Sequence, residues 1–146
     1  MIPHAVHLQI GSLLFEGLDQ IDLTGPFEVL SRIPNSTYRI YAKTVDSVRD
    51  MKGLRLTPDA TLAEAPPLDV LHVPGGFGQE AFIEDEEVLA WIRCQVAGAC
   101  SIYVFAAGVI AGIDDALQLA AELRGDDTAR SIQLQIDYAQ LSIALT

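Results

Sequence analysis

The chain has 146 residues, half of them hydrophobic, and 20 acidic residues outweigh 9 basic ones to give a net charge of −11. This length and apolar content exclude intrinsic disorder and suit a single domain with a substantial core. The negative charge argues against nucleic acid and anionic membranes as partners, because both repel an acidic surface.

No segment indicates a membrane span or an export signal. The uncharged run from Ile102 to Ile113 is too short to cross a bilayer, and Met1 to His4 lacks the basic region of a signal peptide. Cys94 and Cys100 form neither a disulfide framework nor a metal-site spacing, and we expect both to be small buried hydrophobic residues. The sequence therefore predicts a soluble cytoplasmic protein without a metal or a cofactor.

The first half of the chain predicts strands alternating with a helix. His7 to Phe15 is the first expected strand. Gly25-Pro26 then opens a helix, because proline suits the first helical position, and Pro34-Asn35-Ser36 stops it. Tyr38 to Val45 is the second expected strand, and the polar segment around Leu54-Arg55-Leu56 predicts a small hairpin or an edge excursion.

The second half continues the alternation. Asp69 to Val73 is the third expected strand, and the carboxylates of Glu84 to Glu87 mark the start of a helix, where the helix dipole favours negative charge. Ser101 to Phe105 is the fourth expected strand. Gly112 to Leu123 predicts a helix with one apolar side, and Gly125 suits its carboxyl-terminal cap.

The last segment fits two patterns. Apolar residues alternate with polar ones around Ile132 and Leu134, as in a strand, but Ala129, Ile132 and Ile136 also form a helical stripe. We favour the helix, because Asp126 and Asp127 can cap it. Strands alternating with helices predict a parallel sheet that is covered on both faces.

The turn Pro74-Gly75-Gly76-Phe77-Gly78, at the end of an apolar run, is the most informative motif. Two adjacent glycines allow a tight turn whose main-chain amides can hold a developing negative charge. An ordinary strand-to-helix turn is the alternative reading, and Gly-Gly alone would favour it. A second motif, Asp19 to Pro26, changes that balance, since Asp22 follows another strand and would reach the same edge of the sheet.

Four segments together resemble the ThiJ/PfpI superfamily, and within it the isonitrile hydratases. They are Leu13-Leu14-Phe15, Ile21-Asp22-Leu23-Thr24-Gly25-Pro26, Pro66-Pro67-Leu68-Asp69-Val70 and Val73-Pro74-Gly75-Gly76. The resemblance covers about the first hundred residues and resumes from about Val104 to the end. It implies an α/β, flavodoxin-like three-layer sandwich with a mainly parallel sheet, of the class I glutamine amidotransferase-like kind.

The resemblance also implies a reaction and its site residues. In such hydratases a cysteine thiolate on a sharp elbow attacks the isonitrile carbon, and water completes conversion to an N-substituted formamide. The acidic partner falls on Asp22, and the substrate-binding turn falls on Gly75, Gly76 and Phe77. From the residues alone, a carboxyl between Ile21 and Leu23 could have a raised pKa and carry protons, but it could equally be a helix-entry cap.

The chain departs from this pattern where the nucleophile is expected. After Ser101-Ile102-Tyr103 it reads Val104-Phe105-Ala106-Ala107-Gly108, with Ala106 in the register of the cysteine. Val104 onward resembles a later segment of the superfamily, as if Tyr103 were joined to Val104 across a deletion. We therefore expect residues 1–146 to form one internally truncated domain. Cys94 and Cys100 are not convincing replacements for the nucleophile, and His72, within a buried strand, is expected to be a satisfied core histidine and not a base.

Two functions follow as hypotheses. The first is a hydratase-like protein that binds a small molecule such as an isonitrile, is inactive as written, and forms a homodimer. The second is a non-enzymatic module for ligand sensing or dimerisation on the same fold. A nucleotide-binding carrier is less favoured, because the turn after Val73 lacks the Lys and Ser/Thr of a phosphate loop.

Overall fold

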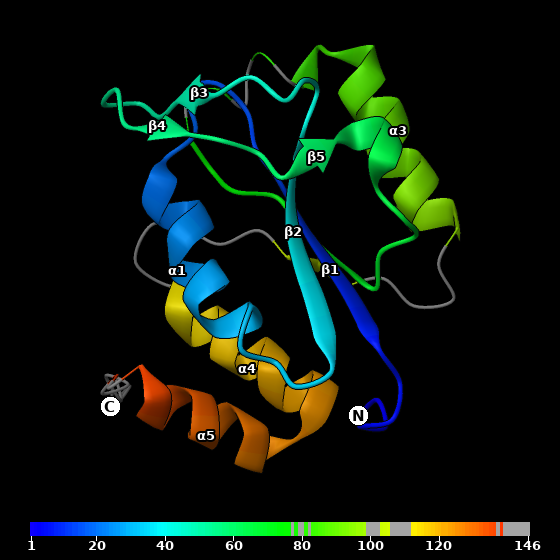
Figure 1. Cartoon of the computed structure of the whole chain (residues 1–146), viewed down its shortest axis with the longest axis vertical. Coiled ribbons are helices and arrows are strands. Elements are labelled where there is room, and N and C mark those ends of the chain that lie inside the picture. Colours follow the sequence, from blue (N-terminus) through cyan, green and yellow to red (C-terminus); the bar gives the residue numbers. More distant parts are fainter. Residues whose placement is uncertain are drawn as a thin grey trace, which may run out of the picture.

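The computed structural model describes residues 1–76, 78, 81, 83–98, 103–105, 112–136 and 138. A five-stranded sheet in the order β5-β2-β1-β6-β7 forms the middle of three layers (Figure 1). All four pairings within it are parallel. The strands are β1 (Leu8–Leu13), β2 (Ser36–Ala42), β5 (Ala60–Thr61), β6 (Val70–His72) and β7 (Tyr103–Phe105). This arrangement confirms the predicted α/β class with a mainly parallel sheet.

Helices cover the sheet from both sides. The described helices are α1 (Gln20–Leu30), the short 3₁₀ helix η1 (Leu62–Glu64), α3 (Glu86–Gly98), α4 (Gly112–Arg124) and α5 (Asp126–Gln135). Figure 1 shows α1, α4 and α5 gathered on one side of the strands and α3 on the other. None of the helices in the described part of the chain is long and apolar enough to cross a membrane.

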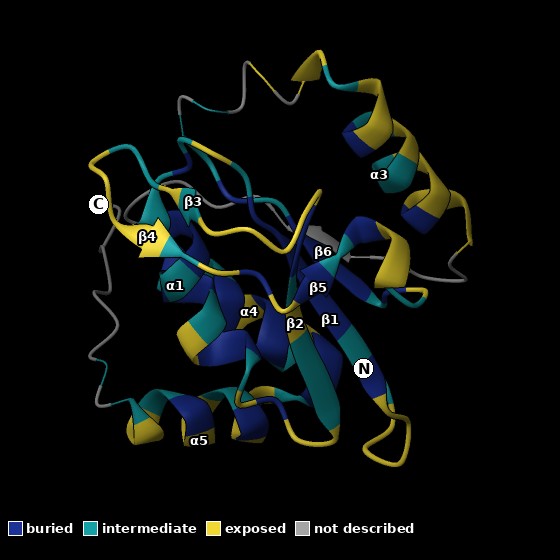
Figure 2. Cartoon of the chain, turned by 45° about the horizontal axis from the view of Figure 1, so that its top comes forward, coloured by how far each residue is buried: buried dark blue, intermediate teal, exposed yellow. Residues whose placement is uncertain are grey.

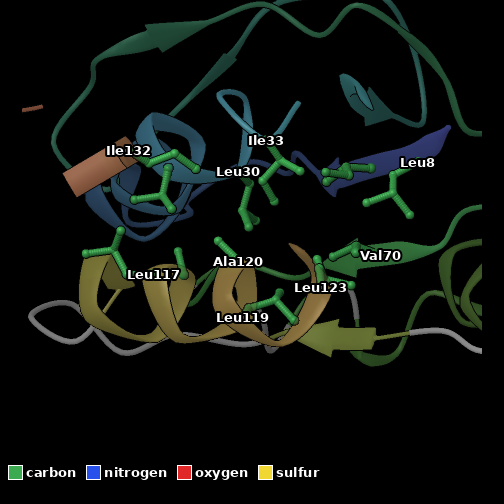
Figure 3. Close-up of a cluster of buried hydrophobic side chains, with 12 residues drawn as sticks. Leu8, Leu30, Ile33, Val70, Leu117, Leu119, Ala120, Leu123 and Ile132 are labelled. Atoms are coloured by element: carbon green, nitrogen blue, oxygen red, sulfur yellow. The ribbon is translucent and has the colours of Figure 1, made fainter. Parts of the chain in front are cut away.

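The larger core lies between the sheet and the layer of α1, α4 and α5 (Figure 3). Leu8 and Ile10 of β1 and Val70 of β6 supply its sheet side. Leu13 and Leu71 point to the opposite face, where they pack in a second cluster with Val88 of α3. Both faces of these strands are therefore buried, which explains why their sequences are almost continuously apolar.

The layer formed by α3 is thin. Only Val88 and Gln95 of its 13 residues are buried, and most of the rest is exposed (Figure 2). The Gln95 side chain holds the helix to the chain before β6, because Oε1 accepts from the Leu68 N–H at 2.9 Å and Nε2 donates to the Pro66 carbonyl at 3.1 Å. At the helix start, Asp85 Oδ1 accepts from the main-chain N–H groups of Glu87 and Val88.

A buried arginine ties the amino-terminal segment to the end of α4. Arg124 is 2% exposed, and its guanidinium donates to the main-chain carbonyls of Ile2, Pro3 and Val6. No carboxylate among the described residues pairs with it. Carbonyl dipoles therefore take the place of a counter-ion at this position.

The structure corrects one helix boundary. The helix expected to open at Gly25-Pro26 instead begins at Gln20, so Pro26 lies inside α1. Asp22 consequently belongs to the first turn of α1, and the cap position is occupied by Asp19. The local pattern favoured proline at a helix start, but the fold accommodates it one turn further in.

Two other predicted elements are confirmed, and one predicted strand ends earlier than expected. β3 (Val48–Arg49) and β4 (Arg55–Leu56) form the predicted hairpin, and α5 confirms the helical reading of the last segment. In α5 the stripe residue Ile132 is buried, whereas Leu134 is 75% exposed. The second strand ends at Ala42 and not at Val45.

Candidate functional site

The candidate site lies where the chain reverses its direction of travel across the sheet. From β1 the chain passes to β2 and β5 on one side, and it then returns to place β6 on the other side of β1. Ligands of open α/β sheets bind in the crevice that such a reversal leaves at the carboxyl ends of the strands. Asp22 follows β1 and Gly75-Gly76 follows β6, so both motifs lie at this crevice.

The loops that follow β1 and β6 contact each other through their main chains. The Asp19 N–H donates to the Gly75 carbonyl at 2.9 Å, and the Gly78 N–H donates to the Gly17 carbonyl at 3.0 Å. A Cβ on Gly78 would lie 2.0 Å from the Glu16 carbonyl oxygen. The glycines therefore permit a close loop-to-loop approach in addition to the tight turn that the sequence predicts.

The β3–β4 hairpin supports the first of these loops. The Gly17 N–H donates to the Arg49 carbonyl at 2.8 Å, and the Met51 N–H donates to the Leu18 carbonyl at 2.9 Å. The Glu16 carboxylate also accepts from the Arg49 N–H at 3.0 Å. Two segments that are distant in the sequence, the β3–β4 hairpin and the loop after β6, thus fix the main chain just before Asp22.

The carboxyl group of Asp22 is buried, with only 3% of the residue exposed. Burial raises its pKa, and the nearby charge of Asp19 adds to this rise. The main-chain amide of Gly75 bonds to the carboxylate and acts in the opposite direction. Gly75 therefore presents its amide to an anion, but that anion is the side chain of Asp22.

Within the described part of the chain, Asp22 Oδ1 accepts no hydrogen bond. A buried carboxyl with a raised pKa and an unused oxygen is suited to general acid–base work, because it can hold a proton closer to neutral pH than an exposed carboxyl. The role of Asp22 as the acidic residue stays a prediction, for which this is the property required.

A buried polar pair lies beneath the crevice. Ser12 of β1 and His72 of β6 are register partners, both fully buried, and Ser12 Oγ lies 2.8 Å from His72 Nδ1. Burial lowers the pKa of His72 to about 4, so the ring is neutral near pH 7. His72 is thus buried in the core, as the sequence analysis expects, and its link to Ser12 was not foreseen.

Two of the cavities in the described part of the chain are prominent, and both lie outside the contact between Asp22 and Gly75. One, of about 260 Å³, lies at the ends of β1 and β2 and is lined mainly by apolar residues that include Leu13, Phe15 and Val88. The larger one, of about 640 Å³, lies beside the start of α5 and is lined by residues that include Arg124 and Asp127. Neither is lined by Asp22 or Gly75, so neither defines the candidate site.

Several predicted residues stand apart from this arrangement. Phe77, Cys100 and the elbow register of Ala106, Ala107 and Gly108 lie outside the described residues. Cys94 was expected to be buried, but it is exposed on α3, because α3 buries only a narrow stripe against the sheet. No cluster of three metal-binding side chains occurs among the residues that the structure describes.

Comparison with known proteins identifies relatives of this chain. It is 36% identical over 180 aligned positions to the isonitrile hydratase of Pseudomonas putida, covering 90% of this chain and 79% of the relative. Ninety per cent of 146 residues is about 131, so about 49 of the aligned positions have no counterpart in this chain.

Solved structures show the same fold. A ThiJ/PfpI family protein from Pseudomonas syringae superposes with a TM-score of 0.83 at 26% identity, covering 95% of this chain and 78% of the other. DJ-1beta of Drosophila melanogaster gives a TM-score of 0.78 at 16% identity, covering 92% of this chain and all of the other. The profile of the DJ-1/PfpI family matches residues 9–116. This chain, with its Asp22–Gly75 contact at the β1/β6 crevice, belongs to the DJ-1/PfpI family.

Proposed function

We propose that the chain is an isonitrile hydratase-like protein that binds a small isonitrile at the β1/β6 crevice and does not hydrate it. The contact between buried Asp22 and the Gly75 amide carries the proposal, because it supplies a proton-carrying acid at the expected place. The 36% identity to an isonitrile hydratase supports the ligand class. Asp22 is the acidic residue, and Gly75, Gly76 and Phe77 form the ligand-binding turn.

The proposed lack of turnover follows from the missing nucleophile. In the family reaction the thiolate adds to the isonitrile carbon, the adduct takes up a proton, and water then displaces the thiol to leave the formamide. Ala106 has no atom that can form this bond, and loss of a covalent nucleophile lowers the rate by several orders of magnitude. The aligned positions without a counterpart support an internal deletion, which we place between Tyr103 and Val104, now consecutive residues of β7.

Binding and turnover are tested separately. A simple alkyl isonitrile is added to the protein, formamide is measured by NMR, and binding is followed by chemical-shift changes at Asp22, Gly75 and Gly76. We expect shifts at these residues without formamide, and smaller shifts with the nitrile of the same alkyl group as a matched control. Formamide formed at an enzymatic rate and abolished by Cys94→Ala or Cys100→Ala would refute the proposed inactivity.

The alternative of a ligand-sensing or dimerisation module draws on the same crevice and on the edge of the sheet. Within the described residues β7 has a partner strand on one side only, β6, and an unpaired strand edge is a place where a second copy can add. Light scattering with and without the isonitrile distinguishes the two functions. A change of mass on binding favours the sensing module, whereas a constant mass favours a binding protein that only lacks its nucleophile.

A further inference from the structure

The cavity of about 260 Å³ at the carboxyl ends of β1 and β2 lies on the β2 side of β1, whereas the crevice of Asp22 lies on the β6 side. We call it the β1/β2 cavity. Its wall includes Leu13 and Leu14, where β1 ends, and Val88 of α3, and all three are buried. Leu13 and Val88 belong to one apolar cluster of the core and Leu14 to another, so the cavity lies where two packed clusters meet.

The volume and the wall of the cavity set the size and polarity of a ligand. An apolar cavity of about 150 Å³ is large enough to bind benzene. The β1/β2 cavity is larger than that, so it has room for one ring or a short alkyl chain together with a small head group. Because the lining is mainly apolar, the body of such a ligand has to be apolar, and only its head group can be polar.

The charged side chains of the lining decide which head group fits. Among the described residues these are Glu16, Lys43 and Asp85. Lys43 Nζ lies 2.6 Å from Asp85 Oδ2 and 3.3 Å from Glu87 Oε2, so two carboxylates already share this ammonium group. Their hydrogen bonds raise the pKa of Lys43 above its ordinary value, and the side chain keeps its charge. Lys43 is therefore occupied by the start of α3 and does not pair with Glu16.

The carboxylate of Glu16 has no cation beside it. No ion pair in the described part of the chain includes Glu16. Its Oε2 accepts from the Arg49 main-chain N–H at 3.0 Å, which places the carboxylate next to Val48, another residue of the cavity wall. One N–H donor leaves further lone pairs of this carboxylate able to accept. An ammonium group fits this position, and the net charge of −11 attracts a cation and repels an anion.

We propose that the β1/β2 cavity binds a small primary amine with an apolar body: the body lies against Leu13, Leu14 and Val88, and the ammonium group donates to the Glu16 carboxylate. This site goes beyond the proposed function, because it is separate from Asp22 and takes a cation, whereas the crevice takes an uncharged isonitrile. Its test uses no isonitrile, so failure of either proposal can be recognised separately.

The first test compares three probes that share one benzene ring and differ in charge at pH 7. They are benzylamine, a cation, benzyl alcohol, which is neutral, and benzoate, an anion. Methyl ¹H–¹³C NMR spectra of the unsubstituted protein follow Leu13, Leu14 and Val88 during each titration. We expect these methyl resonances to shift, with a Kd for benzylamine about fivefold lower than that for benzyl alcohol and with benzoate binding most weakly.

Two results of this comparison would overturn the proposal, and neither depends on a variant being folded. One is equal affinity for benzylamine and benzyl alcohol, because the head group would then not be recognised. The other is that benzylamine shifts none of the three methyl resonances, whether it does not bind or shifts only Asp22, Gly75 and Gly76 at the crevice of the proposed function.

The second test assigns the charge recognition to one carboxylate. Glu16→Gln keeps an acceptor for the Arg49 N–H but removes the charge, so the Kd for benzylamine should rise to that for benzyl alcohol, which should itself stay unchanged. Glu122→Gln is the matched control, because it removes the same charge from an exposed position on α4 that does not line the cavity. It should leave both constants unchanged. Equal losses of benzylamine affinity in the two variants would show that only the net charge of the chain matters and would refute the role of Glu16.

Discussion

A side-chain carbon on Gly76 would lie 2.4 Å from the main-chain nitrogen of Asp19. Gly76 also has a φ of +132°, a backbone conformation that other residues rarely adopt. The loops after β1 and β6 thus meet backbone to backbone, three residues before Asp22. Because Gly76 has no side chain, the loop after β6 can lie directly against the loop after β1. This close approach holds Asp22 against Gly75.

Gly76→Ala should therefore lower the free energy of unfolding by at least about 3 kcal/mol, since backbone strain and steric overlap both act. Gly53→Ala is a matched control: Gly53 also has a positive φ, +95°, but no atom lies within 4 Å of its added carbon. We expect it to lose only about 1 kcal/mol. Urea unfolding measures both, and equal losses would show that the close approach to Asp19 is not important for stability.

Much of the fold could be predicted from the sequence, because local patterns of apolar residues mark most of its strands and helices. The strands β1 and β6 are apolar runs, and α4 is an apolar stripe followed by Gly125. The start of α1 was predicted wrongly, because proline is a local signal for the start of a helix, whereas Pro26 lies inside α1.

The candidate site was predicted in part. Asp22 and Gly75 were singled out through short motifs that resemble those of the superfamily, and both lie within the matched residues 9–116. Ser12 and His72 were not, because they are 60 residues apart and meet only through the register of β1 with β6. A serine and a histidine inside two apolar strands were a signal that polar groups meet there, but the pattern does not say which partner each one has.

The buried ring of His72 predicts an acid-labile fold. Its pKa is lowered from 6.5 to about 4, so between these values the unfolded chain binds a proton that the folded one does not. Acidification across this window should therefore reduce the free energy of unfolding, by on the order of 3 kcal/mol in total. Urea unfolding at a series of pH values measures the slope.

His72→Gln is the control for that window, because glutamine keeps polar atoms at this place but does not titrate. The loss of stability on acidification from pH 6.5 to about 4.5 that comes from the ring should be absent in this variant, whatever its absolute stability. A slope that persists unchanged in His72→Gln would assign the acid sensitivity to other groups.

We predict that Arg124 stabilises the fold through main-chain carbonyls and without a carboxylate partner among the described residues. Arg124→Met would leave the carbonyls of Ile2, Pro3 and Val6 without their donors, and we expect a loss of about 3 kcal/mol or more. Arg93→Met is the matched control, because Arg93 is exposed and, among the described residues, its one ion pair is with exposed Glu86, so its loss should stay within about 0.5 kcal/mol. Thermal unfolding of both variants decides, and similar values would contradict this role of Arg124.

The final prediction concerns the cost of keeping Asp22 buried. Its pKa is raised mainly by burial, so the folded chain binds the proton more tightly than the unfolded chain does. This contribution to stability is fully present below the ordinary aspartate pKa of about 4 and is lost as the pH rises through the folded value. At pH 7 the ionised carboxyl thus destabilises the folded state, and Asp22→Asn should raise the free energy of unfolding by about 1 kcal/mol, the usual size for one stabilising substitution. The gain should vanish below pH 4, where the aspartate is protonated in both states.

Asp50→Asn is the comparison, because the Asp50 carboxylate accepts from the N–H groups of Lys52 and Leu54 in an exposed turn, and no gain is expected there. If Asp22→Asn lost stability at every pH, the bond from the Gly75 amide would outweigh burial, and Asp22 would be a structural cap instead of a strained acid.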